Sequence, residues 1–193
     1  MRKALIIRKT RETDITMSLN IDGKGIFKGT SGIGFFDHML NSLCVHSGID
    51  MELQCKGDLQ VDCHHTVEDI GIVLGKAFSE AMSNKKGIAR YGTFYIPMDE
   101  ALAMASIDVS GRAYLVFNAE FNSERVGEFD TCMTREFFRA FAMNSDTTLH
   151  INLNYGDNAH HCIEAIFKAF AHAIRVAVSS TGSNEELSAK GVL

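Results

Sequence analysis

The sequence predicts an α+β fold, a two-layer α/β domain built from an internally duplicated sheet-plus-helix-pair unit with pseudo-twofold symmetry. The first observation behind this prediction is an H-H-x-x-E signature that occurs twice, at residues 64–68 and 160–164, in segments that align without gaps. The second is that each signature follows strand-like segments ending in a Gly-Asp turn and opens an amphipathic helix. Such self-similarity indicates a repeated structural unit, and two stacked units can share one core.

The first repeat covers about residues 1–92. Short apolar runs predict its strands, and apolar residues spaced three and four positions apart predict its helices. In its last helix, Val67, Ile70 and Ala77 carry that spacing. The predicted order is strand 4–8, strand 15–19, helix 33–43, strand 49–55 and helix 64–81.

The second repeat covers about residues 93–178, and a polar tail, residues 179–193, follows it. We expect the tail to be mobile unless something docks it. Pro97 is the only proline and no linker-like stretch interrupts the chain before the tail, so residues 1–193 are expected to form a single domain. The predicted order of the second repeat is strand 103–109, strand 114–121, helix 134–142, strand 148–153 and helix 160–177.

Composition excludes several classes of protein. A chain of 193 residues with 46% hydrophobic residues is long and apolar enough to bury a core. Its formal net charge of −5, with no basic run, argues against nucleic-acid and membrane binding. The apolar run at residues 4–7 is too short for a signal peptide or a membrane span, which predicts a cytoplasmic protein. The five cysteines are odd in number and lack a C-x-x-C pair, so we expect reduced thiols.

The duplicated signature predicts metal binding. Four of the eight histidines lie in the two motifs. On a helix, the glutamate lies four residues after the first histidine and three after the second, so it can share a face with either imidazole. The two adjacent histidines point about 100° apart, so they suit two different ions. We therefore expect two composite sites, each with a histidine from one repeat, its neighbour from the other and one glutamate. The predicted ligands are His64, His65, Glu68, His160, His161 and Glu164.

Two further ligands are expected to complete the shells. His38 lies 26 residues before His64, and Glu136 lies 24 residues before His160. His150 is an alternative to Glu136, and the sequence leaves that choice open. Imidazole and carboxylate donors without thiolate favour Mn, Fe, Co, Ni or Zn, and leave coordination positions open for a substrate.

Sequence blocks spread over nearly the whole chain resemble those of one enzyme family. They include F-D-H-M-L at 36–40, D-C-H-H-T-V-E-D-I-G at 62–71, P-M-D-E-A-L at 97–102, D-V-S-G-R at 108–112, L-H-I at 149–151, N-A-H-H-C-I-E at 158–164, F-K-A-F at 167–170 and K-G-V-L at 190–193. In this order, they are similar to the imidazoleglycerol-phosphate dehydratases of L-histidine biosynthesis.

The resemblance implies a metal-dependent hydro-lyase. Its reaction converts D-erythro-1-(imidazol-4-yl)glycerol 3-phosphate into 3-(imidazol-4-yl)-2-oxopropyl phosphate with loss of water. It also implies two Mn²⁺ ions per active site and self-association into a homo-oligomer of 24 subunits with active sites between subunits. A neighbouring subunit or the substrate would then order the polar tail and give its residues a role.

The resemblance also implies residue roles. Glu12 is the expected proton-transfer group and contacts substrate, while Glu68 and Glu164 act at the metals. The substrate phosphate is expected to be bound by cations and one hydroxyl group, because guanidinium and ammonium groups suit phosphate. These are Arg90, Arg112, Lys168, Ser188 and Lys190.

Three departures from the family pattern accompany this assignment. Ala113 stands where proline is usual, Ala189 lacks the usual hydroxyl, and Glu136 stands where some members have histidine. A noncatalytic metal-binding cage protein is the alternative from another functional class, and it predicts metal uptake without turnover. A metal-dependent phosphohydrolase is a second alternative, but the Asp-rich two-metal shell typical of that class is absent from the motifs.

Overall fold

The computed structural model describes residues 2–190, so the last three residues of the predicted tail lie outside the described part of the chain. The first half contains the strands and helices expected of one repeat, with one additional strand. In chain order these are β1 (Lys3–Lys9), β2 (Thr13–Asn20), β3 (Phe27–Thr30), α1 (Gly34–Ser47), β4 (Asp50–Gly57) and α2 (His64–Ala81).

The second half has the same order of elements, apart from a small inserted hairpin. Its elements are β5 (Tyr91–Met98), β6 (Ala101–Asp108), β7 (Tyr114–Asn118), β8 (Arg125–Val126), β9 (Phe129–Asp130), α3 (Met133–Ser145), β10 (Thr148–Tyr155) and α4 (Ala159–Ala177). The β8–β9 pair forms the inserted hairpin.

The two halves have the same sheet topology. The first sheet has the order β1-β2-β4-β3 and the second the order β5-β6-β10-β7. In each sheet the first two pairings are antiparallel and the last, β4 with β3 or β10 with β7, is parallel. The equivalence of order and direction confirms the predicted α+β duplication.

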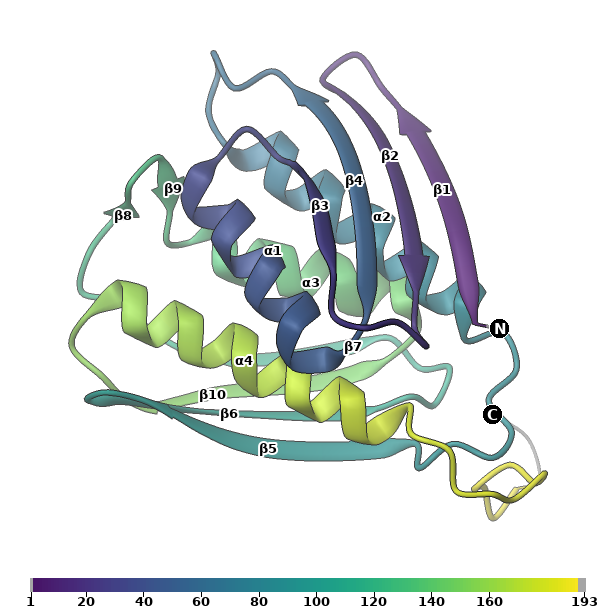
Figure 1. Cartoon of the computed structure of the whole chain (residues 1–193). Helices are drawn as coiled ribbons and strands as arrows, with labels where there is room; N and C mark the ends of the chain where they lie inside the picture. The colour runs from purple at the N-terminus through teal and green to yellow at the C-terminus, as the bar shows by residue number, and fades with distance from the viewer. Residues whose placement is uncertain (1, 191–193) are drawn as a thin grey trace.

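The helices of both halves lie between the two sheets (Figure 1). Helix α2 packs on the first sheet and α4 on the second, while α1 contacts α4 and α3 contacts α2 across the halves. One cluster of buried hydrophobic residues includes side chains from both repeats. Burial alternates along β2 and β6, as expected for strands with one face against helices.

Two glycines permit the closest approaches in this core. A Cβ atom at Gly71 of α2 would lie 2.7 Å from the Phe137 carbonyl oxygen of α3, and one at Gly92 of β5 would lie 1.9 Å from the Ala173 carbonyl oxygen of α4. Any larger residue would therefore push a helix away from its neighbour. These contacts hold α2 and α4, the two helices that each carry one H-H-x-x-E signature.

Besides the inserted hairpin, the structure contains two strands that were not predicted, shortens one predicted strand, and extends the helices predicted at 33–43 and 134–142 to Ser47 and Ser145. Strand β3 was not predicted, because it is only four residues long and contains Gly29 with a φ of +117°. Strand β5 was not predicted either; it contains Pro97 and lies at the edge of its sheet, where a missing N–H is tolerated. The strand predicted at 114–121 ends at Asn118.

The described helices include none with the length and apolar character needed to cross a membrane. The tail, as far as Lys190, is irregular and contacts the segment that joins the halves. Gly87 donates its N–H to the Glu185 carbonyl oxygen at 3.0 Å, and Thr181 donates to the Gly87 carbonyl oxygen at 2.8 Å. These contacts dock the described part of the tail on its own chain.

A pair of histidines joins α1 to α4, and so joins the two halves. His46 Nδ1 and His172 Nε2 are 3.2 Å apart, and the His172 ring stacks on Phe94 at a centroid distance of 4.7 Å. Burial lowers the pKa of both histidines. The pKa of His46 is lowered further by His172 and Lys168, while Glu164 acts in the opposite direction. The pKa of His172 is lowered further by Arg175. Both rings are therefore stable in the neutral form.

This pair predicts a pH-dependent stability. Because the folded-state pKa is depressed, the unfolded chain binds more protons below about pH 6.5, so stability is fully present above that pH and falls as the pH drops towards the folded-state value. We expect the wild-type Tm to fall by a few degrees more than that of His172→Gln between about pH 7.5 and about pH 5.5. Thermal unfolding at both pH values measures this, and equal shifts in the two proteins would contradict it.

Candidate metal centre

Three side chains from both halves of the chain converge on one point. His38 comes from α1, and His160 and Glu164 come from the first turns of α4; one ligand atom of each lies within 4.8 Å of the others. Glu164 Oε2 is 3.3 Å from His160 Nε2 and 3.6 Å from His38 Nε2. Within residues 2–190, this is the one group of three or more such donors close enough to share an ion.

Local structure explains this convergence. Asn158 caps α4 by accepting the His160 backbone N–H at 2.9 Å, and the i,i+4 spacing then places Glu164 beside His160. The edge of the Phe35 ring contacts His160 at a centroid distance of 4.9 Å. Contact between α1 and α4 brings His38 to the same place.

Glu164 is buried, with 7% of its surface exposed, yet it is held in the charged form. Burial opposes ionisation, but Lys168 Nζ donates to Glu164 Oε1 at 2.8 Å, and His38 and His160 add favourable charge, so the pKa of Glu164 is lowered. The oxygen Oε1 is engaged by lysine, while Oε2 faces the two histidines. A carboxylate in this state is suited to metal coordination.

The equivalent residues of the other half are less tightly grouped. His64 Nε2 is 3.6 Å from Glu68 Oε2, again at i,i+4 spacing. Glu136 of α3 occupies the place that His38 has on α1, and it lines the same pocket of about 770 Å³ as His64. The duplication thus places equivalent donors in both halves: His38, His160 and Glu164 form one group, whereas His64 pairs with Glu68 and shares a pocket with Glu136.

His150, the alternative to Glu136, lies elsewhere. It is an exposed residue of β10 between the buried Leu149 and Ile151, so its side chain is on the outer face of the sheet, opposite the helices. Glu136 is therefore the candidate that the fold brings near His64.

The second histidine of each signature has different partners. His65 Nδ1 is 3.0 Å from Asp58 Oδ2, and His161 Nδ1 is 2.7 Å from Glu100 Oε2. These hydrogen bonds are the main reason why the pKa of each histidine is raised. The hydrogen bond with His161, together with one from the Asn158 backbone N–H, lowers the pKa of Glu100 to about 2. Neither histidine belongs to the three-ligand group among the described residues.

Glu12 lies in the turn between β1 and β2, with Oε1 3.7 Å from His65 Nε2. The turn is anchored to α2 by Asp69, a buried residue that accepts hydrogen bonds from Arg8 and from the Thr13 hydroxyl at 2.5 Å. Thr10 Oγ1 accepts the Glu12 backbone N–H at 3.1 Å. This network holds Glu12 beside the signature helix.

Most of the expected phosphate-binding residues gather at another place. Asp108 accepts hydrogen bonds from Arg90 Nε at 2.8 Å and from Arg112 Nη2 at 3.3 Å, so both guanidinium groups meet at one carboxylate. Arg90 Nη1 also donates to the Leu187 carbonyl oxygen at 2.5 Å, which holds the tail segment with Ser188 and Lys190 beside it. Lys168 is separate from this set and contacts Glu164 instead.

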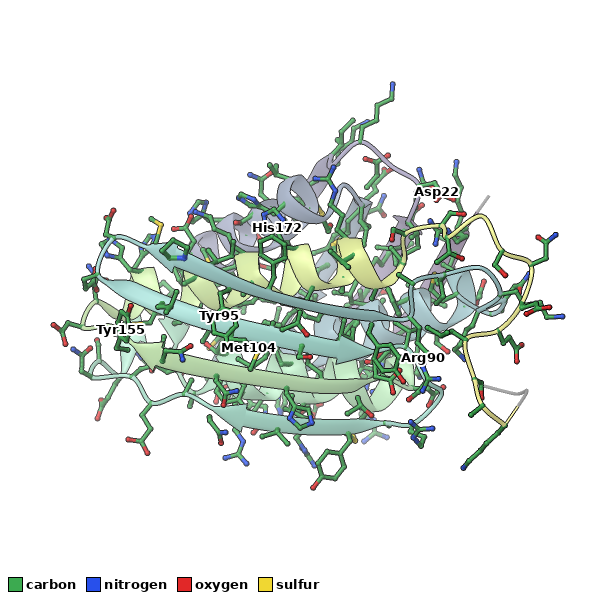
Figure 2. The ribbon with its side chains drawn as sticks, turned by 90° about the horizontal axis from the view of Figure 1, so that it is seen from below. Asp22, Arg90, Tyr95, Met104, Tyr155 and His172 are labelled. Carbon is green, nitrogen blue, oxygen red and sulfur yellow. The ribbon has the colours of Figure 1, made fainter. Side chains whose placement is uncertain are left out.

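The metal group and the arginines lie at opposite ends of α4. The Arg90 backbone N–H bonds to the Ala177 carbonyl oxygen at the last turn, whereas His160 is in the first turn. At 1.5 Å per residue, the two ends are about 25 Å apart. Figure 2 shows Arg90 at the end of the second sheet beside the tail and Tyr155, which precedes α4, at the opposite end.

The structure thus forms part of the predicted arrangement within one chain. His38, His160 and Glu164 come together, whereas the two H-H-x-x-E motifs do not form a common ligand group in the described residues. Asp58 and Glu100 were not predicted as partners of the second histidines. Their positions in turns, Asp58 after β4 and Glu100 before β6, were the available signal.

The fold and the site define a duplicated α/β protein whose imidazole and carboxylate donors have the character of a catalytic metal site, with nitrogen and oxygen but no thiolate ligands. The family model for imidazoleglycerol-phosphate dehydratase matches residues 31–174. The chain belongs to the imidazoleglycerol-phosphate dehydratase family. Dehydratases of this kind are hydro-lyases, and a noncatalytic cage is not favoured.

Relatives of known name match over nearly full length. Imidazoleglycerol-phosphate dehydratase of Clostridium kluyveri is 53% identical over 194 residues, with 100% of both chains covered. That of Oceanobacillus iheyensis is 54% identical and covers 100% of this chain and 96% of its own.

Two solved structures share the fold. The crystal structure of imidazoleglycerol-phosphate dehydratase from Staphylococcus aureus has a TM-score of 0.85 and 44% identity, covering 93% of this chain and 99% of its own. That of the Pyrococcus furiosus enzyme, in complex with (S)-C348, has a TM-score of 0.82 and 34% identity, covering 97% and 100%.

Proposed function

We propose that the protein catalyses the metal-dependent dehydration of D-erythro-1-(imidazol-4-yl)glycerol 3-phosphate to 3-(imidazol-4-yl)-2-oxopropyl phosphate, a step in L-histidine biosynthesis. The observation that carries this proposal is the His38–His160–Glu164 group, because it gathers two imidazoles and an ionised carboxylate from separate helices. The family membership supplies the reaction class.

The donor set fits a divalent transition metal. Two nitrogen donors and one oxygen donor suit Mn²⁺ and leave positions open for a substrate. We propose two Mn²⁺ ions per active site, held by His38, His64, His65, Glu68, Glu136, His160, His161 and Glu164. The ions would supply Lewis acidity towards the substrate imidazole ring.

The chain's own groups would then transfer the proton and hold the phosphate. The reaction removes a hydroxyl from the carbon attached to the ring and a hydrogen from the next carbon, and the resulting enol becomes the ketone. Glu12, held at the turn beside His65, is the proposed group that takes the carbon-bound proton. The phosphate would be bound by Arg90, Arg112, Lys168, Ser188 and Lys190.

The placement of these groups supports active sites shared between subunits. A three-carbon phosphate is too short to reach from the metal group at one end of α4 to the arginines at the other, about 25 Å away. One copy would therefore supply metal ligands and another would supply cations. We propose assembly into a homo-oligomer of 24 subunits on this basis and by family resemblance. The five unpaired cysteines support a reducing, cytoplasmic location.

Incubation of the purified protein with Mn²⁺ and the imidazoleglycerol phosphate substrate tests the proposal. We expect a ketone product that depends on metal and appears without release of inorganic phosphate. Phosphate release would instead indicate a phosphohydrolase, and metal uptake without either product would indicate a cage protein. Either outcome would overturn the dehydratase assignment.

A further inference from the structure

The second histidine of each signature has its Nδ1 atom within hydrogen-bonding distance of a carboxylate oxygen. His65 is paired with Asp58 at 3.0 Å and His161 with Glu100 at 2.7 Å. The first histidines, His64 and His160, instead have Nε2 beside the glutamate four residues later. Among the described residues, the second histidines therefore have a carboxylate at Nδ1, whereas the first histidines have theirs at Nε2.

Such a pairing determines which nitrogen can bind a metal. When Nδ1–H donates to a carboxylate, the neutral ring carries its lone pair on Nε2, and the ring cannot rotate without losing the hydrogen bond. Metal-bound histidines generally have such a partner on the second nitrogen, and it raises the basicity of the ligand. The observed contacts leave Nε2 of both second histidines as the ligand atom.

The two carboxylates come from places that are not equivalent in the repeats. Asp58 lies in the turn after β4, and its side chain is mostly buried, with 16% exposed. Glu100 lies in the turn between β5 and β6, where its position corresponds to that of Glu12 between β1 and β2. The same hydrogen bond is thus made by different turns in the two halves, so it does not follow from the duplication alone.

Glu100 is held on both of its oxygens. Oε2 contacts His161, while Oε1 accepts the backbone N–H groups of Asp157 at 3.2 Å and Asn158 at 2.7 Å. Because Asn158 also caps α4, one carboxylate connects the β5–β6 turn to the start of the helix and to the His161 ring. This geometry leaves Glu100 little freedom to move away from the imidazole.

From these contacts, we propose that Asp58 and Glu100 are positioning residues that hold His65 and His161 with Nδ1–H bonded and Nε2 directed to a divalent metal. The inference rests on the proposed function only in so far as these two histidines are metal ligands. Neither carboxylate is assigned to the metal or to the substrate. Loss of either should weaken metal binding rather than abolish the fold.

The test is a titration of the metal-free full-length protein with Mn²⁺, using Asp58→Asn and Glu100→Gln, which preserve side-chain size. We expect each variant to bind Mn²⁺ about 10- to 100-fold more weakly, because outer-shell partners of metal ligands have effects of that order. Turnover should return towards the wild-type value when Mn²⁺ is in large excess. Recovery with excess metal is a result that a purely structural role would not produce.

Asp157→Asn is the matched control for loss of one negative charge. Asp157 lies in the loop between β10 and α4 and contacts Glu100 only through its backbone N–H, so substitution of its side chain should leave Mn²⁺ affinity unchanged. Wild-type affinity in both Asp58→Asn and Glu100→Gln would overturn the inference, as would activity losses that excess Mn²⁺ does not restore. Wild-type protein that binds Mn²⁺ but forms no ketone would refute the dehydratase assignment instead, while the titration would still decide the positioning roles.

Discussion

A His160→Ala variant should lose metal from the His38–His160–Glu164 group and, with it, catalytic turnover. His160 Nε2 is 3.3 Å from Glu164 Oε2, and the remaining two donors come from different helices. We expect metal affinity and kcat to fall by on the order of 100-fold or more, since even outer-shell changes cost about 10- to 100-fold. Metal analysis of the purified protein and steady-state kinetics at fixed Mn²⁺ measure both effects.

His150→Ala is the matched control, because His150 is an exposed histidine on the outer face of β10. It should retain wild-type metal content and turnover. If His150→Ala lost metal and His160→Ala did not, the assignment of the α1–α4 group would be wrong.

Because the metal group and the arginines lie at opposite ends of α4, complementation between two variants gives a second test of the His160→Ala variant. Co-expression of His160→Ala chains with Arg112→Ala chains should recover part of the activity that each lacks alone, because a site that takes ligands from one subunit and cations from another can be intact in a mixed oligomer. If one chain supplied both groups to the same site, no mixed oligomer would contain an intact site, and no recovery would be seen.

Replacement of Glu12 by glutamine should produce the second large effect, with a different signature. Glutamine keeps the size of the side chain but cannot accept the substrate proton, so kcat should fall by about 10²- to 10⁴-fold, the usual contribution of general acid–base catalysis. Metal content should stay near the wild-type value, because Glu12 lies outside the three-ligand group. Metal analysis and single-turnover kinetics on the same preparation separate the two properties.

Glu52→Gln serves as the control for this change, since Glu52 is an exposed carboxylate on β4. It should leave kcat unchanged. A Glu12→Gln protein with full turnover would transfer the proton-transfer role to another group, and one that lost its metal would make Glu12 part of the metal shell.

Much of the fold could be predicted because the relevant signals are local. Apolar spacing placed the signature helices, which begin at His64 and Ala159. The duplication was visible in the aligned motifs, and the matching sheet orders confirm it. The missed strands have weak local signals: β5 contains a proline, and β3 is short with a left-handed glycine.

The site was predictable in its residue types but not in its groupings. His160 and Glu164 are linked by helical spacing, which is a property of four consecutive peptide units. His38 reaches them only because α1 packs on α4, more than 100 residues away in the chain. Lys168, which is also proposed to contact the phosphate, bonds to Glu164 within one chain, because the same i,i+4 spacing places it one turn further along α4.

Periodicity and residue chemistry are local properties of the chain, and they are enough to predict the duplication, the signature helices and the kinds of donor atoms available. Packing between distant segments brings particular donors to one point, places Asp58 and Glu100 against the second histidines, and sets the arginines at the far end of α4. These relations depend on how close-packed helices and sheets meet, because contacts between residues distant in the chain leave no fixed spacing in the sequence.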